Sequence, residues 1–168
     1  MEYLFLKRKK TTAASERQKV LLFKAAEQQW EKQFASAVTD GRKVDNHIYK
    51  GILYQLEIRQ VFLDPRLSLQ KLSAMIDTNQ TYLSNVVNRY FGCNLKELVN
   101  TYRVQYAKEL LCADRYPLEE IFGRCGFASK SAFYAAFNKM TGTSPLHYQL
   151  RERRKRALHL QEEMIPIH

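Results

Sequence analysis

An internal repeat constrains the fold of this chain more than any other feature of its sequence. Residues 68–92 and 117–142 share one pattern, in which a short apolar stretch is followed by a turn and a longer amphipathic stretch. The apolar positions recur after 49 residues before the turn and after 50 residues beyond it. A loop absorbs such a one-residue slip without disturbing either packed helical face. The repeat therefore predicts two copies of a unit made of a short helix, a tight turn and a longer helix.

The turn and cap residues of both copies support this prediction. Asn79 and Ser129 precede the longer helices, and both residue types are favoured N-caps. Asp77 and Gly126 occupy the turns, where a left-handed backbone is expected, which glycine adopts freely and aspartate at some cost. Residues spaced by three and four positions are expected to be buried in the longer helices: Leu83, Val86, Val87 and Tyr90 in the first copy, and Phe133, Ala136, Phe137 and Met140 in the second. Ser144 is expected to cap a last helix that begins at Pro145.

Helices are also expected before and between the copies. Apolar residues at helical spacing between positions 95 and 111 predict one continuous helix of about 18 residues, roughly 27 Å long. Residues 12–38 predict a further helix, and residues 40–43, Asp-Gly-Arg-Lys, are expected to break the pattern and mark a domain boundary before a helix over 48–62. The apolar stripe of the 12–38 helix comprises Val20, Leu21, Phe23, Ala26, Trp30, Phe34 and Val38.

Charge and composition narrow the classes of function. The net charge of +10, from 27 basic and 17 acidic side chains, favours a polyanionic partner, which leaves DNA, RNA and an anionic membrane open. Cys93, Cys112 and Cys125 have no CxxC spacing, so free thiols are expected rather than a zinc site or disulfides. We find no paired nucleophile and base, metal spacing or glycine-rich phosphate loop, and we therefore expect no enzyme, metal or cofactor.

Several motifs together resemble the AraC/XylS family of transcription regulators. They are Gly126-Phe-Ala-Ser-Lys-Ser-Ala-Phe-Tyr134, Phe137-Asn-Lys139, Gly142-Thr-Ser-Pro145 and Tyr148, with Thr81-Tyr-Leu-Ser84 and Phe91-Gly92 in the first copy. The resemblance covers roughly residues 48–151. It implies an all-α fold of seven helices with two helix-turn-helix units and a long linker helix, preceded here by an N-terminal helical extension. Four residues depart from the family pattern: Asp77, Phe122, Ala135 and Gln149.

The resemblance and the chain ends imply an organisation in three segments. Residues 1–45 would form a basic, helical extension, residues 46–151 the double helix-turn-helix domain, and residues 152–168 a basic C-terminal tail. Such domains often end membrane-anchored or hybrid two-component sensors of Bacteroidetes-like bacteria. Tyr3-Leu-Phe-Leu6 followed by Lys7-Arg-Lys-Lys10 is then interpreted as a juxtamembrane tether of a cytoplasmic domain, with a frayed basic terminus as the alternative.

The expected function is sequence-specific binding of double-stranded DNA for transcription regulation, with both units in adjacent major-groove segments. The 27 Å linker helix suits that arrangement, because successive major-groove faces on one side of B-DNA lie about 34 Å apart. A homodimer through the N-terminal helix, a contact to RNA polymerase and an upstream membrane or two-component sensor region are left open as further partners. An RNA-binding module and a helical protein-interaction module remain the alternatives.

The residues expected to contact DNA lie on the exposed faces of the two longer helices. In the first copy they are Gln80, Thr81, Ser84, Asn85 and Asn88, and in the second Lys130, Ser131, Tyr134 and Lys139. Amide and hydroxyl side chains pair with base edges, whereas lysine suits phosphate. We therefore expect the first copy to read sequence, chiefly through Thr81, Ser84 and Asn85, and the second to anchor the backbone. An ordinary solvated polar face is the alternative interpretation.

Overall fold

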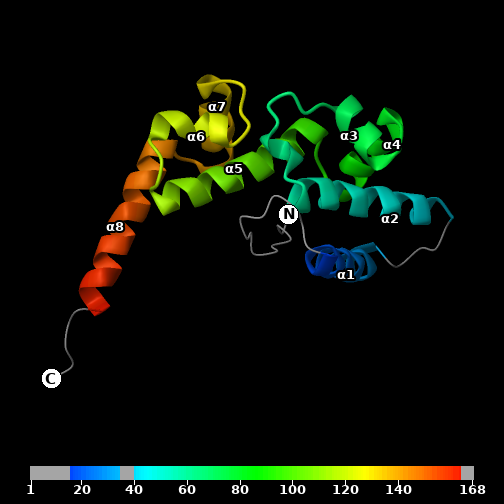
Figure 1. Cartoon of the computed structure of the whole chain (residues 1–168), viewed down its shortest axis with the longest axis horizontal. Coiled ribbons are helices and arrows are strands. Elements are labelled where there is room, and N and C mark those ends of the chain that lie inside the picture. The colour runs from blue at the N-terminus through cyan, green and yellow to red at the C-terminus, as the bar shows by residue number, and fades with distance from the viewer. Residues whose placement is uncertain (1–15, 35–39, 164–168) are drawn as a thin grey trace. The chain divides into compact units, whose positions relative to one another are not determined.

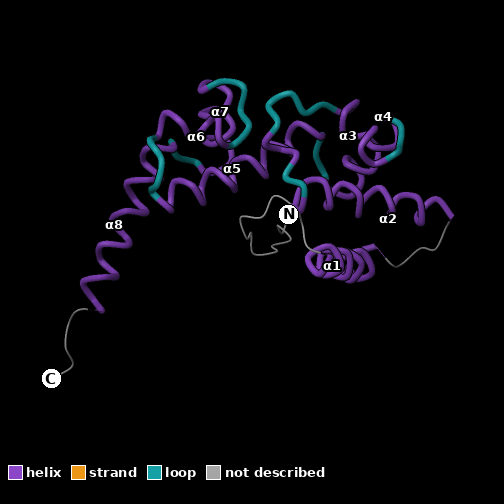
Figure 2. The backbone as a smooth tube through the Cα atoms, viewed as in Figure 1, coloured by secondary structure: helices purple, strands orange, loops and turns teal. Residues whose placement is uncertain are grey.

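A computed structural model describes residues 16–34 and 40–163, and all regular elements in these ranges are helical (Figures 1 and 2). The α-helices are α1 (Glu16–Phe34), α2 (Asp40–Leu53), α3 (Leu69–Ile76), α4 (Gln80–Val86), α5 (Leu95–Ala113), α6 (Leu118–Arg124), α7 (Lys130–Thr141) and α8 (Pro145–Glu163). Two π-helical segments, η1 (Tyr54–Ile58) and η3 (Val87–Phe91), and a 3₁₀ turn, η2 (Val61–Leu63), complete the set. The expected all-α fold of seven helices, α2 to α8, behind an N-terminal helix is confirmed.

The chain divides into two compact units that share α5. The first unit contains α1 to α4 and the beginning of α5, and the second contains the rest of α5 with α6, α7 and α8. The connection at residues 63–65 belongs to the second unit, where Arg103 donates a hydrogen bond of 2.8 Å to the Asp64 carbonyl. Each unit thus contains one copy of the sequence repeat, and the linker helix predicted between the copies is α5.

The turns of the two copies have the same backbone hydrogen bonds. Thr78 N–H donates to the Ser73 carbonyl and Phe127 N–H to the Phe122 carbonyl, both at 3.0 Å. Asp77 and Gly126, which precede these donors, have positive φ of 57° and 80° as expected. This pattern is the Schellman motif, in which a left-handed residue ends the helix and the next amide reaches back to a free carbonyl.

The one-residue slip of the repeat lies between this motif and the next helix. Thr78 is followed directly by the N-cap Asn79, whereas Ala128 stands between Phe127 and the N-cap Ser129. Beyond the caps both helices have 12 residues, from 80 to 91 and from 130 to 141, and each ends at a left-handed glycine, Gly92 or Gly142. The predicted repeat, its slip in the turn and both N-caps are therefore confirmed.

The N-terminal part of the first unit differs from the sequence expectation. Residues 40–43 do not break the helical pattern, because α2 begins at Asp40, eight residues before the expected start. The helix expected over 48–62 is instead α2 followed by η1 and η2, with a left-handed Gln60 between them (φ 52°). Gly51 allows close packing, because a Cβ there would lie 2.7 Å from Cγ2 of Ile76 on α3.

Helix α1 packs on α2 and η1 (Figure 1), and its buried stripe is shifted from the expected one. Ala26 and Trp30 are buried as predicted, but Val20, Leu21 and Phe23 are exposed, and Leu22, which was not expected in the stripe, is fully buried. Leu22, Ala26 and Trp30 are four residues apart, which places them on one helical face. Residues 12–15 and 35–38 of the expected helix, and the basic start at 3–10, lie outside the described residues.

The second unit has an aromatic core. Phe127, Phe133 and Phe137 are buried, and their rings meet at centroid distances of 5.4 Å (Phe127–Phe133) and 5.6 Å (Phe133–Phe137). The expectation that Met140 is buried is wrong, since its side chain is 39% exposed. Residues 152–163, expected as a tail, continue α8. Cys125 is a buried free thiol, and Cys93 and Cys112 are half-buried. No helix among the described residues is long and apolar enough to cross a membrane.

Candidate functional site

Helix α4 presents an uncharged polar face to solvent. Its N-cap Asn79 accepts a hydrogen bond of 2.9 Å from the Tyr82 amide, and Leu83, Val86 and Val87 anchor the opposite face in the core. All five residues proposed for the first copy lie on the outer side: Gln80, Thr81, Asn85 and Asn88 are exposed and Ser84 is half-buried. No ionisable carboxylate or cation occurs between Gln80 and Asn88. Amides and hydroxyls of this kind donate to and accept from base edges in a major groove.

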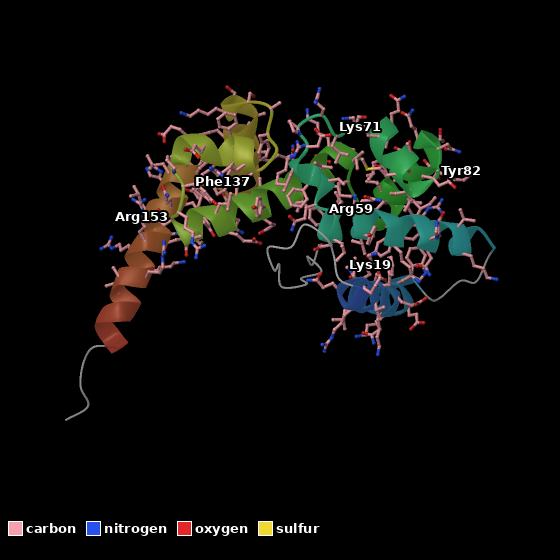
Figure 3. All side chains as sticks on the ribbon, viewed as in Figure 1. Lys19, Arg59, Lys71, Tyr82, Phe137 and Arg153 are labelled. Atoms are coloured by element: carbon pink, nitrogen blue, oxygen red, sulfur yellow. The ribbon has the colours of Figure 1, made fainter. Side chains whose placement is uncertain are left out.

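Tyr82 also belongs to this face, and the sequence reasoning missed it. Its side chain is 55% exposed, although the next residue, Leu83, is buried. Figure 3 labels Tyr82 at the outer side of α4. The signal in the sequence was an aromatic residue outside the three-and-four spacing of the buried stripe. An exposed tyrosine offers both an apolar ring and a hydroxyl to a partner.

Helix α4 continues into η3, and we call residues 80–91 together the recognition helix. Its C-terminal end is held by ionic and aromatic contacts. Asp45 on α2 accepts hydrogen bonds from Tyr90 Oη at 2.7 Å and from Arg89 Nη1 at 3.1 Å. Burial, and then this hydrogen bond to Asp45, raise the pKa of Tyr90, so the hydroxyl stays protonated as a donor. The Trp30 ring lies 4.5 Å from the Tyr90 ring, centroid to centroid. Arg89 is thus paired with Asp45, while 68% of its side chain stays exposed.

Two further rings complete what we call the aromatic cluster, defined as Trp30, Tyr49, Tyr90 and Phe91. Tyr49 on α2 lies 5.2 Å from Trp30 and stacks on Phe91 at 5.0 Å. Burial raises the pKa of Tyr49 to about 12. The cluster therefore joins α1 and α2 to η3, the π-helical end of the recognition helix.

Helix α7 presents a different surface. Its N-cap Ser129 accepts from the Ala132 amide at 3.2 Å, and Lys130, Ser131 and Lys139 are exposed as predicted. Tyr134 is half-buried, with its ring edge-on to Phe133 at 5.6 Å and Lys130 Nζ 5.7 Å from its centroid. Between Lys130 and Lys139 the exposed residues include Ala132 and Ala135, which offer methyl groups alone. This surface suits contact with phosphate oxygens more than discrimination among bases.

The short helices that precede the recognition helices also differ in charge. The second and third residues of α3 are Gln70 and Lys71, whereas the equivalent residues of α6 are Glu119 and Glu120. Glu120 is paired with Arg124 at 2.8 Å, and that guanidinium lies 3.8 Å from the centre of the Tyr116 ring. The first helix of such a motif crosses the DNA backbone. The positive charge at the start of α3 therefore suits a contact with phosphate better than the two carboxylates at the start of α6.

Gln149, one of the departures from the family pattern, is buried and has a structural contact. Its amide donates to Asp114 Oδ1 at 2.9 Å, and Arg153 donates to both oxygens of the same carboxylate at 2.6 and 2.8 Å. Asp114 follows α5 in a left-handed conformation (φ 54°). These bonds fasten α8 to the end of α5 and hold the pKa of Asp114 below its usual range, chiefly through Arg153.

Comparisons with known proteins agree with this geometry. Residues 72–151 match the family model described as a helix-turn-helix domain. The chain is 30% identical over 87 residues to the probable transcriptional regulator LumQ of Photobacterium leiognathi, covering 52% of this chain and 35% of LumQ. It is 25% identical over 93 residues to the melibiose operon regulatory protein of Escherichia coli K12, covering 55% of this chain and 31% of that protein. The chain thus spans about a third of the length of these curated relatives.

A solved structure gives the same result. The C-terminal domain of AraT, a response regulator from Geobacillus stearothermophilus, has 26% sequence identity and a TM-score of 0.56, covering 62% of this chain and 84% of that one. The match to the family model, at residues 72–151, falls on the part of the molecule that holds the two copies of the repeat.

Proposed function

We propose that this chain carries an AraC-type helix-turn-helix DNA-binding domain and that it regulates transcription by reading duplex DNA chiefly through α4. The observation that carries the proposal is the exposed face of α4, where amides and hydroxyls stand without a charge. An ordinary solvated helix face holds Glu and Lys, as the outer side of α1 does. Thr81, Ser84 and Asn85 are the proposed base-reading residues, with Gln80 and Asn88 beside them.

The second unit is proposed as the backbone anchor. Lys130 and Lys139 would lie against phosphates, with Ser131 and Tyr134 as further hydrogen-bonding groups. We propose that both units occupy adjacent major-groove segments, a spacing to which the 19 residues of α5, about 28 Å of helix, are suited. An upstream sensory region that controls this binding and a contact to RNA polymerase are parts of the same proposal for the whole protein.

The oligomeric state is a separate question. Ala26 and Trp30, on the stripe considered for a dimer, are buried by the chain's own α2 and η3. This favours docking of α1 within the chain over a coiled coil between two chains. Analytical ultracentrifugation of the chain with and without residues 1–45 tests the preference.

The central experiment selects duplexes from a random pool with the full chain and then measures Asn85→Ala and Ser84→Ala. Each variant is expected to lose about 1–3 kcal/mol of affinity, roughly 5- to 150-fold, for a selected duplex, because a base contact is removed. Affinity for a scrambled duplex should stay unchanged at the same salt concentration. Gln28→Ala, an exposed polar residue of α1, serves as the matched control.

Two results would contradict the proposal. Equal losses on selected and scrambled duplexes would mean that Ser84 and Asn85 do not read bases. Single-stranded or duplex RNA that displaces the chain as well as a selected DNA duplex does would favour the RNA-binding alternative.

A further inference from the structure

Helix α1 packs against α2 and η1 of the first unit along one whole face. Leu22 and Ala26 are fully buried and Trp30 is 7% exposed, so one face of the helix is covered along its length. At the rim, Glu27 pairs with Lys50 of α2 at 2.9 Å and Phe23 lies 5.8 Å from Tyr54 of η1. A buried indole contributes strongly to such packing, since replacing tryptophan by alanine in a core costs about 3–5 kcal/mol.

This interface reaches the recognition helix itself through Trp30. The indole lies against the ring of Tyr90, whose hydroxyl is bonded to Asp45 on α2. The ring of Tyr90 is thus held by α1 and its oxygen by α2. Its neighbour Phe91 stacks on Tyr49, so both residues at the end of η3 are fixed from outside the helix.

The second unit shows how the same segment behaves without this support. Met140 occupies the position of Tyr90 in the repeat, and it is 39% exposed at the end of a helix that stays α-helical to Thr141. In the first unit the equivalent segment, Val87–Phe91, is π-helical. A π-turn within a helix is rare and is frequently associated with function.

We propose that α1 is a positioning element for DNA reading, and that Trp30 sets the orientation of Asn88 and the far end of the α4 face by fixing η3. Asn88 lies within η3, two residues before Tyr90, so the contact that holds Tyr90 also holds the backbone that carries Asn88. Trp30 touches no base in this proposal, and it acts through Tyr90. The inference rests on the proposed reading of DNA by this face.

The test compares the full chain with Trp30→Ala, Trp30→Phe and Tyr90→Phe, using one duplex selected by the unaltered chain and one scrambled duplex. The ratio of the two affinities should fall by about 2- to 30-fold in Trp30→Ala, because coupling of this kind is typically worth 0.5–2 kcal/mol. Trp30→Phe should restore most of the ratio, since a ring again supports Tyr90. Tyr90→Phe, which keeps the ring and removes the bond to Asp45, should lower the ratio by about 2- to 12-fold, the range that corresponds to the loss of one hydrogen bond of ordinary strength.

Leu21→Ala, at a 47% exposed position of α1, is the matched control and should leave the ratio unchanged. A purely structural role would lower the Tm of Trp30→Ala and leave its ratio at the value of the unaltered chain, and that result overturns the inference. If Trp30→Ala does not fold, Tyr90→Met decides, because it removes the ring that Trp30 contacts and introduces the residue type found at Met140. An unchanged ratio in that variant overturns the inference equally. An unaltered chain that selects no duplex at all overturns the proposed function instead, together with the inference that rests on it.

Discussion

The two helix-turn-helix units have the same backbone frame and different supports. Each recognition segment runs for 12 residues from a capping side chain to a left-handed glycine. In the first unit its outer face carries no charge from Gln80 to Asn88 and its far end is covered by α1 and α2, whereas in the second it carries lysines and its far end is exposed at Met140. The local hydrogen bonds of the repeat thus give both units the same backbone frame, while their side chains and neighbouring helices give them different surfaces.

The largest expected effect concerns the cores, which are aromatic in the second unit and mainly aliphatic around α4. Phe137→Ala should cost about 3–5 kcal/mol because it leaves a cavity among the Phe127, Phe133 and Tyr148 rings. Trp30 is the one tryptophan of the chain and lies in the first unit, so its fluorescence follows that unit alone. In denaturant unfolding, Phe137→Ala should therefore lower the midpoint of the transition followed by circular dichroism more than the midpoint followed by Trp30 fluorescence. Equal shifts of both signals would mean that the units unfold together and share their stability.

An intermediate effect should separate the two recognition helices at one equivalent position. Lys130→Ala should weaken a selected and a scrambled duplex equally and reduce the salt slope by about 0.9, because one phosphate contact is lost. Gln80→Ala, 50 residues earlier in the repeat, should weaken the selected duplex and leave the salt slope unchanged. Affinities measured over a series of salt concentrations test both statements. If Lys130→Ala instead weakens binding to the selected duplex alone, the second unit also reads bases and the proposed difference between the units is wrong.

The smallest effect is expected for Asp114→Asn, in the carboxylate contact found in the second unit. Arg153 lowers the pKa of Asp114 in the folded chain, so the ionised carboxylate stabilises the fold at neutral pH. That contribution is lost as the pH falls from the ordinary aspartate value of about 3.9 through the lowered pKa of the folded state. The variant should thus be less stable than the unaltered chain at pH 7 and equally stable in strong acid. A difference in stability that stays constant with pH would show that the carboxylate charge does not matter here.

Local sequence features predicted the turns and helix caps of both repeat copies well, and the packing of other helices around them poorly. Caps, left-handed turn residues and buried spacings depend on neighbours within a few positions, and Asn79, Ser129, Asp77 and Gly126 were all found as expected. The shifted stripe of α1 and the exposure of Met140 depend on which helix lies opposite, which spacing alone does not specify. The contacts of η3 with Trp30 and Tyr49 likewise join rings that are distant in the sequence. The roles of the nine proposed contact residues remain predictions about a complex with DNA.

The matched ends of the two recognition segments also make them candidates for exchange. Residues 79–92 and 129–142 have the same length, begin with an oxygen-bearing cap and end at a glycine with φ near 70°. A chimera that carries the first segment in the second frame would keep both termini of the helix intact. It would transfer Tyr90 without its partners Trp30 on α1 and Asp45 on α2. A segment transferred with its contacts intact would therefore include α1 and α2 as well as the recognition helix.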